Sequence, residues 1–324
     1  MISLKSLIGA AALSCVAAMA SAQVIGIATD AQGSLNYSVG TALAGVMQEK
    51  ANIATRVQPL SGSTTYTTLI NRGQVEFGLV NAVDVANAYK GIANFKDHKN
   101  PDLRLAGVIF PIQNGIAVPN DSPVKSIGDL KGLRMPTQFT AQSTIRAVQN
   151  AMLATAGLSS DDIKGFPVAD MFKGMRALGE GKVDAAVSCF TCAMAKEVNV
   201  ALAAHGGMRF LPLPDTPEAV AAMRKIFAAA RTQVFPALPA FTGIHVPTRL
   251  FVYSDFLVVN KNVPDELVYK TLKAIHESKA QLMATSAPMK GFNPKMMAEA
   301  NPVPYHPGAE KFYKEIGQWP PKMP

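Results

Sequence analysis

The chain has 324 residues, with 31 Lys and Arg against 23 Asp and Glu, a formal net charge of +8, and three Cys. This length is too great for one small core and fits two domains of ordinary size. The basic residues are scattered along the chain rather than clustered, which excludes the basic face typical of a nucleic-acid-binding protein.

The first 22 residues have the pattern of a cleaved signal peptide. Lys5 precedes an apolar stretch over 7–20, and 20–22 read Ala-Ser-Ala, the small-x-small pattern that a signal peptidase cuts, so we expect the mature chain to begin at Gln23. The apolar stretch is shorter than the roughly 20 residues that span a bilayer. Cys15 leaves lipidation open as an alternative, although the residues before it match the usual lipidation signal poorly. The sequence therefore predicts an exported, periplasmic protein.

Strands and helices alternate after this segment. A buried strand is predicted over 24–28, and the apolar spacing between residues 39 and 47 predicts a helix after it. A second strand over 133–135 precedes a second helix of this kind, whose apolar stripe runs from 145 to 153. This alternation is typical of an α/β protein in which helices cover a mainly parallel sheet.

The second half of this pattern repeats the first. Residues 69–80 resemble residues 177–188, because each stretch reads as a helix end, a Gly suited to a left-handed cap, and a buried strand. Upstream, residues 31–35 are echoed by residues 141–145, and both stretches stand just before a predicted helix. The repeat predicts two lobes of the same construction.

Two extended apolar runs, over 105–118 and 251–259, predict where the chain crosses between the lobes. We therefore expect lobe 1 to comprise residues 23–112 and 252–324, lobe 2 to comprise residues 113–251, and two strands to form the hinge. In open α/β sheets, ligands bind beyond the carboxyl ends of the strands. The cleft between the lobes is the predicted binding site.

Five polar loops face this predicted cleft, over 29–37, 59–65, 81–84, 137–144 and 188–192. Loops that open into helices present free N–H groups and the positive end of the helix dipole, which favours anions, and carboxylates especially. The residues that we expect to contact a ligand are Asp30, Gln32, Ser34, Asn36, Tyr37, Ser61, Gly62, Ser63, Asn81, Asp84, Gln138, Phe139, Gln142, Ser143, Thr144, Phe190 and Thr191.

Several of these residues also have purely structural interpretations. Four of the hydroxyl side chains are equally suited to cap a helix: Ser34, Ser63, Ser143 and Thr144. Tyr37 and Phe139 suit either a flat pocket wall or the core. Asp30 and Asp84 suit either an Asx turn or an acceptor for a ligand amine. The sequence leaves these alternatives open.

Cys189 and Cys192 form a C-x-x-C pair in the last of these loops. In an oxidising compartment a disulfide is one interpretation, and two inert thiols are another. A redox site would need a thioredoxin-like fold, which the preceding strand does not begin. A zinc site would recruit His205, but no fourth ligand follows at the required spacing. We expect a structural role.

Enzyme motifs are missing from the sequence. It contains no G-x-S-x-G, no H-E-x-x-H, no P-loop and no dinucleotide-binding Gly pattern. We therefore expect no catalytic residues, no cofactor, no metal and no nucleic-acid partner. The expected molecule is a monomer that binds a small-molecule ligand.

Over essentially the whole mature length, the chain resembles the TAXI family of TRAP transporter solute-binding proteins. The resemblance is carried, in order, by residues 27–44, 60–63 with 73–81, 121–132, 264–269 and 304–309. It implies a type II periplasmic-binding-protein fold, a ligand held between the lobes, and delivery to the membrane permease subunits of a TRAP transporter. Known ligands of that family are mostly small carboxylates such as glutamate or 2-oxoglutarate.

The family's binding loops fall here on residues 30–37, 61–63, 81–84 and 138–144. Two of them depart from the family pattern, since Asp30, Ala31 and Gln32 stand where Gly and Thr are usual, and 139–143 carry bulkier side chains than the usual Gly and Pro. Glutamate is therefore one candidate among several. An ABC-transporter receptor of similar fold and a redox protein that uses the Cys pair are the alternatives.

Overall fold

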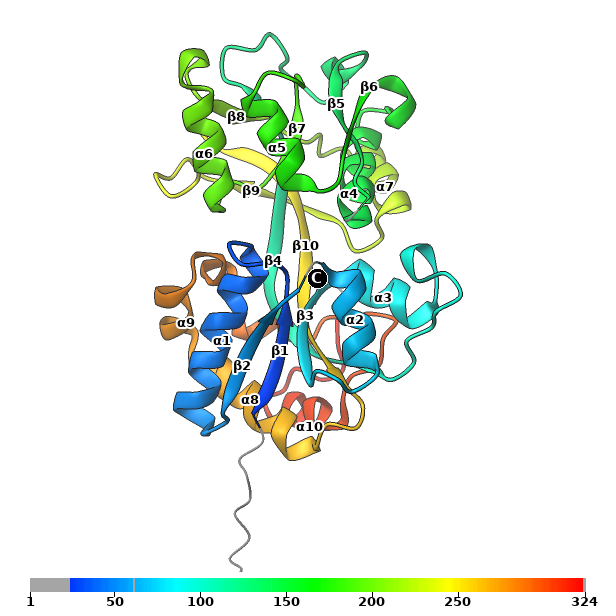
Figure 1. The fold of residues 1–324 in the computed structure, drawn as a ribbon, viewed down its shortest axis with the longest axis vertical. Helices are drawn as coiled ribbons and strands as arrows, with labels where there is room; N and C mark the ends of the chain where they lie inside the picture. Colours follow the sequence, from blue (N-terminus) through cyan, green and yellow to red (C-terminus); the bar gives the residue numbers. More distant parts are fainter. Residues whose placement is uncertain (1–23, 61, 141, 323–324) are drawn as a thin grey trace, which may run out of the picture.

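The computed structural model describes residues 24–60, 62–140 and 142–322. Two long strands, β4 (Leu103–Pro119) and β10 (Thr248–Asn260), run side by side through two lobes, as Figure 1 shows. The predicted signal peptide with Cys15 and Gln23 lies outside the described residues, as does Ser61. Within the described part of the chain, every helix is too short or too polar to cross a membrane.

Lobe 1 is built around strands that pair with the first part of β4 and the last part of β10. Its elements are β1 (Ile25–Thr29), α1 (Leu35–Ala51), β2 (Thr55–Pro59), α2 (Ser63–Asn71), β3 (Phe77–Asn81), α3 (Ala82–Lys90), α8 (Asp265–Glu277), α9 (Lys279–Thr285) and α10 (Pro307–Glu315). β1 pairs in parallel with β2 and β3, and β10 pairs antiparallel with β3 and β4. All five residues of β1 and of β3 are buried, because helices cover both faces of the sheet.

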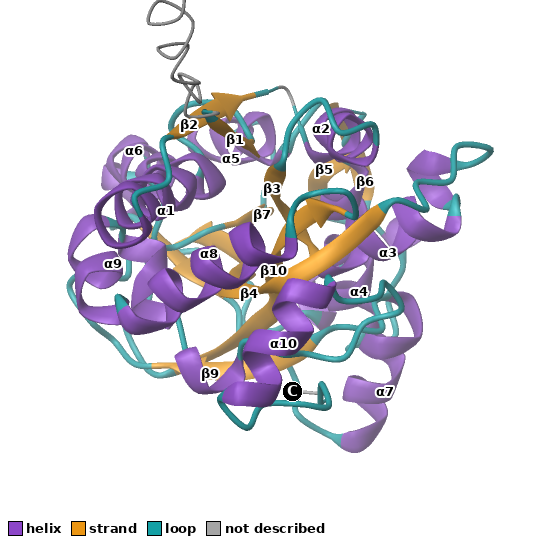
Figure 2. Ribbon diagram, turned by 90° about the horizontal axis from the view of Figure 1, so that it is seen from below, coloured by secondary structure: helices purple, strands orange, loops and turns teal. Residues whose placement is uncertain are grey.

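Figure 2 shows these helices on the two sides of the lobe 1 strands. Alternate strand residues enter different clusters of buried side chains: Ile27 and Leu257 pack with α1, α8 and α10, whereas Ala28 and Phe256 pack with α2 and α3. This alternation follows from the period of two in a strand.

Lobe 2 has its own helices and strands around the other ends of β4 and β10. Its elements are β5 (Arg134–Gln138), α4 (Ser143–Ala154), β6 (Lys164–Val168), α5 (Met171–Gly179), β7 (Ala186–Ser188), α6 (Ala193–Ala201), β8 (Met208–Phe210), α7 (Pro217–Ile226) and β9 (Arg231–Phe235). Only β5 and β6 pair in parallel here; β7 and β8 pair antiparallel with β4, and β9 with β10. The α/β class is confirmed, with mixed rather than mainly parallel pairing, because the antiparallel strands β4 and β10 continue through both lobes.

The two lobes repeat the same order of elements. β1-α1-β2-α2-β3-α3 in lobe 1 corresponds to β5-α4-β6-α5-β7-α6 in lobe 2. The predicted echo of residues 69–80 in residues 177–188 falls on α2-β3 and α5-β7. The internal repeat is therefore a repeat of structure.

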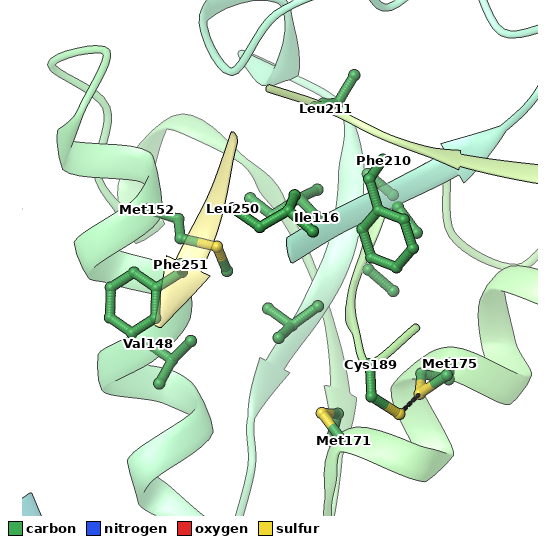
Figure 3. Close-up of a cluster of buried hydrophobic side chains, with 14 of the residues drawn as sticks. Ile116, Val148, Met152, Met171, Met175, Cys189, Phe210, Leu211, Leu250 and Phe251 are labelled. Carbon is green, nitrogen blue, oxygen red and sulfur yellow. Dashed lines mark hydrogen bonds between the residues drawn. The ribbon is translucent and has the colours of Figure 1, made fainter. Parts of the chain in front are cut away.

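The buried side chains separate into a lobe 2 cluster and two lobe 1 clusters. Figure 3 shows part of the lobe 2 cluster, where Val148 and Met152 of α4 lie near Leu250 and Phe251 of β10. Along β4 the clusters change between 110 and 116, and along β10 between 253 and 256. The predicted crossings at 112/113 and 251/252 lie close to these changes, and the exact boundaries stay a prediction.

Candidate functional site

An inner cavity of about 90 Å³ lies where the two lobes meet. The two crossing strands form its floor, with Ile112 and Asn114 of β4 and Tyr253 and Asp255 of β10. Its walls are helix starts and the residues next to them, from α1, α2 and α3 of lobe 1 and from α4 and α5 of lobe 2. These walls consist of Asp30, Ser34, Leu35, Asn36, Ser63, Thr64, Tyr66, Asn81, Asp84, Gln142, Ser143, Thr144, Ile145, Met171 and Phe172.

An outer cavity of about 320 Å³ adjoins the inner one. Four residues border both cavities: Asp30, Ser34, Gln142 and Phe172. From lobe 2 the outer cavity adds Asp170 and Glu197, and from lobe 1 it adds Gln32. Together the two cavities approach the size of an ordinary small-molecule site.

Asp84 is a buried carboxylate whose two oxygens both accept hydrogen bonds. Its Oδ2 accepts from the Ser63 hydroxyl at 2.5 Å and from Asn81 Nδ2 at 2.8 Å, and its Oδ1 accepts from the Thr144 hydroxyl. Asn81 also caps α3, since its Oδ1 accepts from the backbone N–H groups of Val83 and Asp84. The donors to Asp84 come from both lobes.

Among the residues that the structure describes, two hydrogen bonds join α4 to lobe 1 beside the cavity. Thr144 at the start of α4 donates to Asp84 of α3, and Asn94 of lobe 1 donates to Ser143. Both bridges depend on the hydroxyl groups in the first turn of α4. The structure represents a conformation in which the two lobes contact each other across the cleft.

Asp255 is a buried carboxylate of the opposite kind. Its side chain has no exposed area, and neither oxygen has a hydrogen-bond partner among the described residues. It lies at an irregularity of β10, because the pairing with β4 shifts register between Asp255 and Phe256. On the facing strand, Asn114 is 1 % exposed, and its Oδ1 likewise has no described partner. Two residues of the cavity floor thus hold three buried oxygens that have no described hydrogen-bond partner.

The electrostatic character of the cavity is acidic. Burial raises the pKa of Asp30 to about 6, the charge of Asp84 adds to this rise, and hydrogen bonding to Tyr66 opposes it. Burial raises the pKa of Asp255 well above its ordinary value, and the charges of Asp30 and Asp84 raise it further. Burial also raises the pKa of Tyr253 and of Tyr66. None of the described residues that line either cavity is Lys, Arg or His.

Arg231, a half-buried cation of lobe 2, interacts through a hydroxyl group with a carboxylate outside the cavities. Arg231 of β9 donates to the Ser254 hydroxyl at 3.2 Å, and Ser254 in turn donates to the buried Glu299. Burial lowers the pKa of Arg231 and raises that of Glu299. This network lies beside the hinge, outside the linings of both cavities.

The helix starts around the cavity differ in how their N–H groups are used. Ser34 caps α1, Asn81 caps α3 and Asp170 caps α5. Gln142 also accepts a hydrogen bond from the backbone N–H of Met171. Helices α2 and α4 have no side-chain cap, so their first N–H groups remain suited to an anionic group.

Ten of the residues predicted to bind the ligand line the inner cavity, the outer cavity, or both. They are Asp30, Gln32, Ser34, Asn36, Ser63, Asn81, Asp84, Gln142, Ser143 and Thr144. Of the four predicted caps, only Ser34 caps a helix. The hydroxyl groups of Ser63 and Thr144 instead bind Asp84, and that of Ser143 accepts from Asn94.

Six other predicted residues do not line these cavities: Tyr37, Gly62, Gln138, Phe139, Phe190 and Thr191. Phe139 and Phe190 are 1 % exposed and belong to the core of lobe 2, because Phe190 packs against rings from distant segments, such as Phe210 and Phe235. Gln138 is exposed at the end of β5, and Tyr37 is half-buried beyond the cap of α1.

Gly62 precedes α2 as its N-cap residue. Its φ of 148° lies in a region that side chains rarely adopt. Thr191 is half-buried between two bonded cysteines. Its loop is the lobe 2 counterpart of the loop over 81–84, yet only the lobe 1 loop reaches the cavity.

Cys189 and Cys192 are joined by a disulfide and are buried in lobe 2. Cys189 Sγ lies 3.9 Å from Met175 Sδ, and Figure 3 marks this contact with a dashed line. In the described part of the chain, no group of three His, Cys, Asp or Glu side chains is arranged to hold a metal.

Several cavity residues were not predicted from the sequence, chiefly Asp255, Asn114 and Tyr66. Asp255 interrupts the apolar run over 251–259. A lone carboxylate in a buried strand is a signal that would have identified it, since such groups are rarely buried without a partner.

A cavity enclosed by helix starts of two lobes, at strands that connect them, is the arrangement of a two-lobed solute-binding protein. The chain belongs to the NMT1-like family, whose model matches residues 27–317.

Solved structures share the fold at low sequence identity. A TctC solute-binding protein from Polaromonas has a TM-score of 0.53 and 15 % identity, over 83 % of this chain and 89 % of that one. PhnD1 from Prochlorococcus marinus, solved with methylphosphonate, has a TM-score of 0.53 and 10 % identity, over 91 % and 98 %. The aliphatic sulphonate binding protein SsuA from Escherichia coli has a TM-score of 0.50 and 16 % identity, over 84 % and 75 %.

Proposed function

We propose that this protein is a periplasmic receptor that captures a small polar ligand between its lobes and delivers it to a membrane transporter. The observation that carries the proposal is the inner cavity, whose polar lining comes from helix starts of both lobes and from the two connecting strands. A ligand held by both lobes binds the closed form more tightly than the open form and so stabilises it. The transporter then recognises the closed form. The signal-peptide pattern of residues 1–22 supports export.

The proposed transporter is of the TRAP type, as the resemblance to the TAXI family implies. An ABC transporter is the second candidate, because the sequence leaves a receptor of that class open and the fold shared with SsuA, PhnD1 and the TctC protein, at TM-scores from 0.50 to 0.53, favours neither class of transporter. The genes beside this one distinguish the two, because a TRAP system has an ion-coupled permease and an ABC system has an ATPase.

A carboxylate ligand, as the sequence suggested, is supported by the uncapped starts of α2 and α4. The acidic residues and the absence of Lys, Arg and His from the described lining argue against it. Catalysis and redox chemistry are not part of the proposal, because the disulfide is buried away from both cavities.

The test combines identification of the ligand with a measurement of closure. Native mass spectrometry of the protein purified from its own host identifies a co-purified molecule, and small-angle scattering then follows the radius of gyration with and without it. We expect one small polar molecule per chain and a smaller radius in its presence. A protein that binds no molecule from periplasmic or growth-medium extracts, or that binds one without any change in shape, contradicts the proposal.

A further inference from the structure

We propose that the ligand presents a protonated primary amine to Asp255 and Asn114 on the floor of the inner cavity. This inference rests on the proposed function and names the chemical class of its ligand.

The first argument is the chemistry of the unpaired atoms. Asp255 and Asn114 both line the cavity, and both carboxylate oxygens of Asp255 and Oδ1 of Asn114 are buried without a described partner. The Nδ2 group of Asn114 already faces Met171 Sδ at 3.6 Å. All three unpaired atoms are acceptors when Asp255 is ionised, so a molecule that satisfies them must bring hydrogen-bond donors. A primary ammonium group has three N–H donors and no acceptor.

The second argument is charge. Asp30, Asp84 and Asp255 lie around one small cavity, and Asp170 and Glu197 border the outer cavity that leads to it. No Lys, Arg or His stands among the described lining residues, and the half-buried Arg231 donates to Ser254. An acidic cavity in a protein of net charge +8 is a local arrangement rather than a reflection of composition. It favours a cation over the carboxylate expected from the sequence.

The third argument separates an organic amine from other cations. The described residues contain no metal-holding group of three His, Cys, Asp or Glu, so the three cavity carboxylates are not arranged around one ion. A quaternary ammonium group has no N–H donor and leaves the acceptors of Asp255 and Asn114 unpaired. A primary amine satisfies both the charge and the acceptors.

The test uses small probes that differ in the charged groups they carry. Thermal-shift and calorimetric titrations compare methylamine, ethanolamine and 1,4-diaminobutane with choline, acetate, succinate, calcium chloride and 4-aminobutanoate, all at millimolar concentration. We expect stabilisation by primary amines and by any amino acid that fits, and none by choline, the carboxylates or calcium. Stabilisation by succinate or calcium but by none of the amines overturns the proposal, and so does the lack of any response to the amines.

Variants locate the amine. Asp255→Asn retains the shape of the side chain but removes its charge, and we expect amine affinity to fall at least about 30-fold. Asn114→Ala is expected to lower it about 10-fold, through the loss of one acceptor. The matched control is Asp161→Asn, which makes the same charge change on an exposed residue remote from the cavity lining. Full amine affinity in a folded Asp255→Asn protein overturns the assignment.

The pH dependence provides a readout with opposite signs for the two ligand classes. The titratable groups that face one another here are Asp30, Asp84, Asp255, Tyr66 and Tyr253. Since burial raises the pKa of Asp30 to about 6 and raises that of Asp255 well above its ordinary value, an ammonium ligand displaces protons from these carboxyls. Amine affinity should therefore rise with pH through about 6, with proton release in the calorimeter. Carboxylate binding would take up protons and weaken over the same range.

The outcomes separate this inference from the proposed function. A co-purified ligand without an amine that still closes the lobes leaves the receptor function intact and refutes the amine. A protein that binds amines without any change in shape supports the cation site and refutes delivery by closure.

Discussion

Asp84 and Asp255 are buried aspartates that line the same cavity, but their carboxyl groups differ in hydrogen bonding. Asp84, in the first turn of α3, accepts hydrogen bonds from Ser63, Asn81 and Thr144. Asp255, in the middle of β10, accepts none from the described residues. The first lies at a helix start, where loops and a neighbouring lobe supply donors, and the second lies in a strand whose backbone groups already pair with β3 and β4.

The difference shows how stability and binding are divided in this cleft. A fully satisfied buried carboxylate is held in place by its donors and, here, also joins the lobes. An unsatisfied one costs free energy in the ligand-free protein and is retained where a function needs it. The predictions that follow test whether the two carboxylates really differ in this way.

The largest expected effect follows the loss of Asp84. Asp84→Ala leaves three donors without an acceptor, two of them on the buried residues Asn81 and Thr144, so we expect the free energy of unfolding to fall by about 2–4 kcal/mol. Urea denaturation at neutral pH measures it. Asp255→Asn is the matched change, and it should leave stability equal or higher, because Asp255 makes no hydrogen bond to a described residue and burial disfavours its charged form. A comparable loss of stability in both variants would abolish the distinction between the two carboxylates.

The next effect is the pH dependence that Asp30 contributes. Its pKa is about 6 in the folded protein and 3.8 in the unfolded chain, so the folded state binds more protons between these values. Its contribution to the free energy of unfolding is therefore present below about pH 4 and is lost as the pH rises through about 6, by about 3 kcal/mol in total.

The measurement is urea denaturation of the ligand-free protein at a series of pH values. Asp30→Asn should remove this downward slope, whereas Asp161→Asn should retain it. The comparison between variants matters because Asp129 and Asp184, whose pKa values are lowered by hydrogen bonds, act with the opposite sign in more acidic solution. Parallel curves for the wild type and Asp30→Asn would show that Asp30 is not perturbed.

A smaller effect is expected from the bridge between the lobes. Thr144→Val replaces the hydroxyl that donates to Asp84 by a methyl group of similar shape. We expect the closed form to lose about 1 kcal/mol relative to the open form, visible as a larger radius of gyration in small-angle scattering. Thr41→Val is the control, because the Thr41 hydroxyl bonds within α1 and is exposed. An unchanged radius would mean that Asp84 stabilises lobe 1 alone.

The contrast between the two carboxylates also marks how far the sequence could be interpreted. For Asp84, the local sequence was sufficient to predict a position beside the cleft, because the residue stands in a polar loop directly after a predicted strand. Asp255 stands in the run over 251–259 that was correctly predicted as an extended crossing segment. Its orientation toward the cavity depends on pairing with β3 and β4 and on the register shift beside it, which are contacts between residues far apart in the chain.

The prediction that Phe139 and Phe190 contact the ligand was wrong, also because of contacts between residues far apart in the chain. Phe139 and Phe190 stand in the predicted loops, but rings and aliphatic side chains from distant segments draw both into the core of lobe 2. The internal repeat predicted that the loop over 188–192 would face the ligand, as its counterpart over 81–84 does. The repeat determines the order of strands and helices in each lobe. The packing of side chains within each lobe determines which of the two equivalent loops reaches the cavity.

The smallest effect on binding is expected for the disulfide in that second loop. Neither Cys189 nor Cys192 lines a cavity, and both are buried in lobe 2. Replacing both by Ser should change the affinity for an amine probe by less than about twofold, because additivity holds for sites that share no partners. Calorimetry on the folded double variant measures it, and Asp255→Asn serves as the positive control. A loss of binding equal to that of Asp255→Asn would mean that the lobe 2 loop shapes the site after all, and that the two halves of the repeat act on the ligand together.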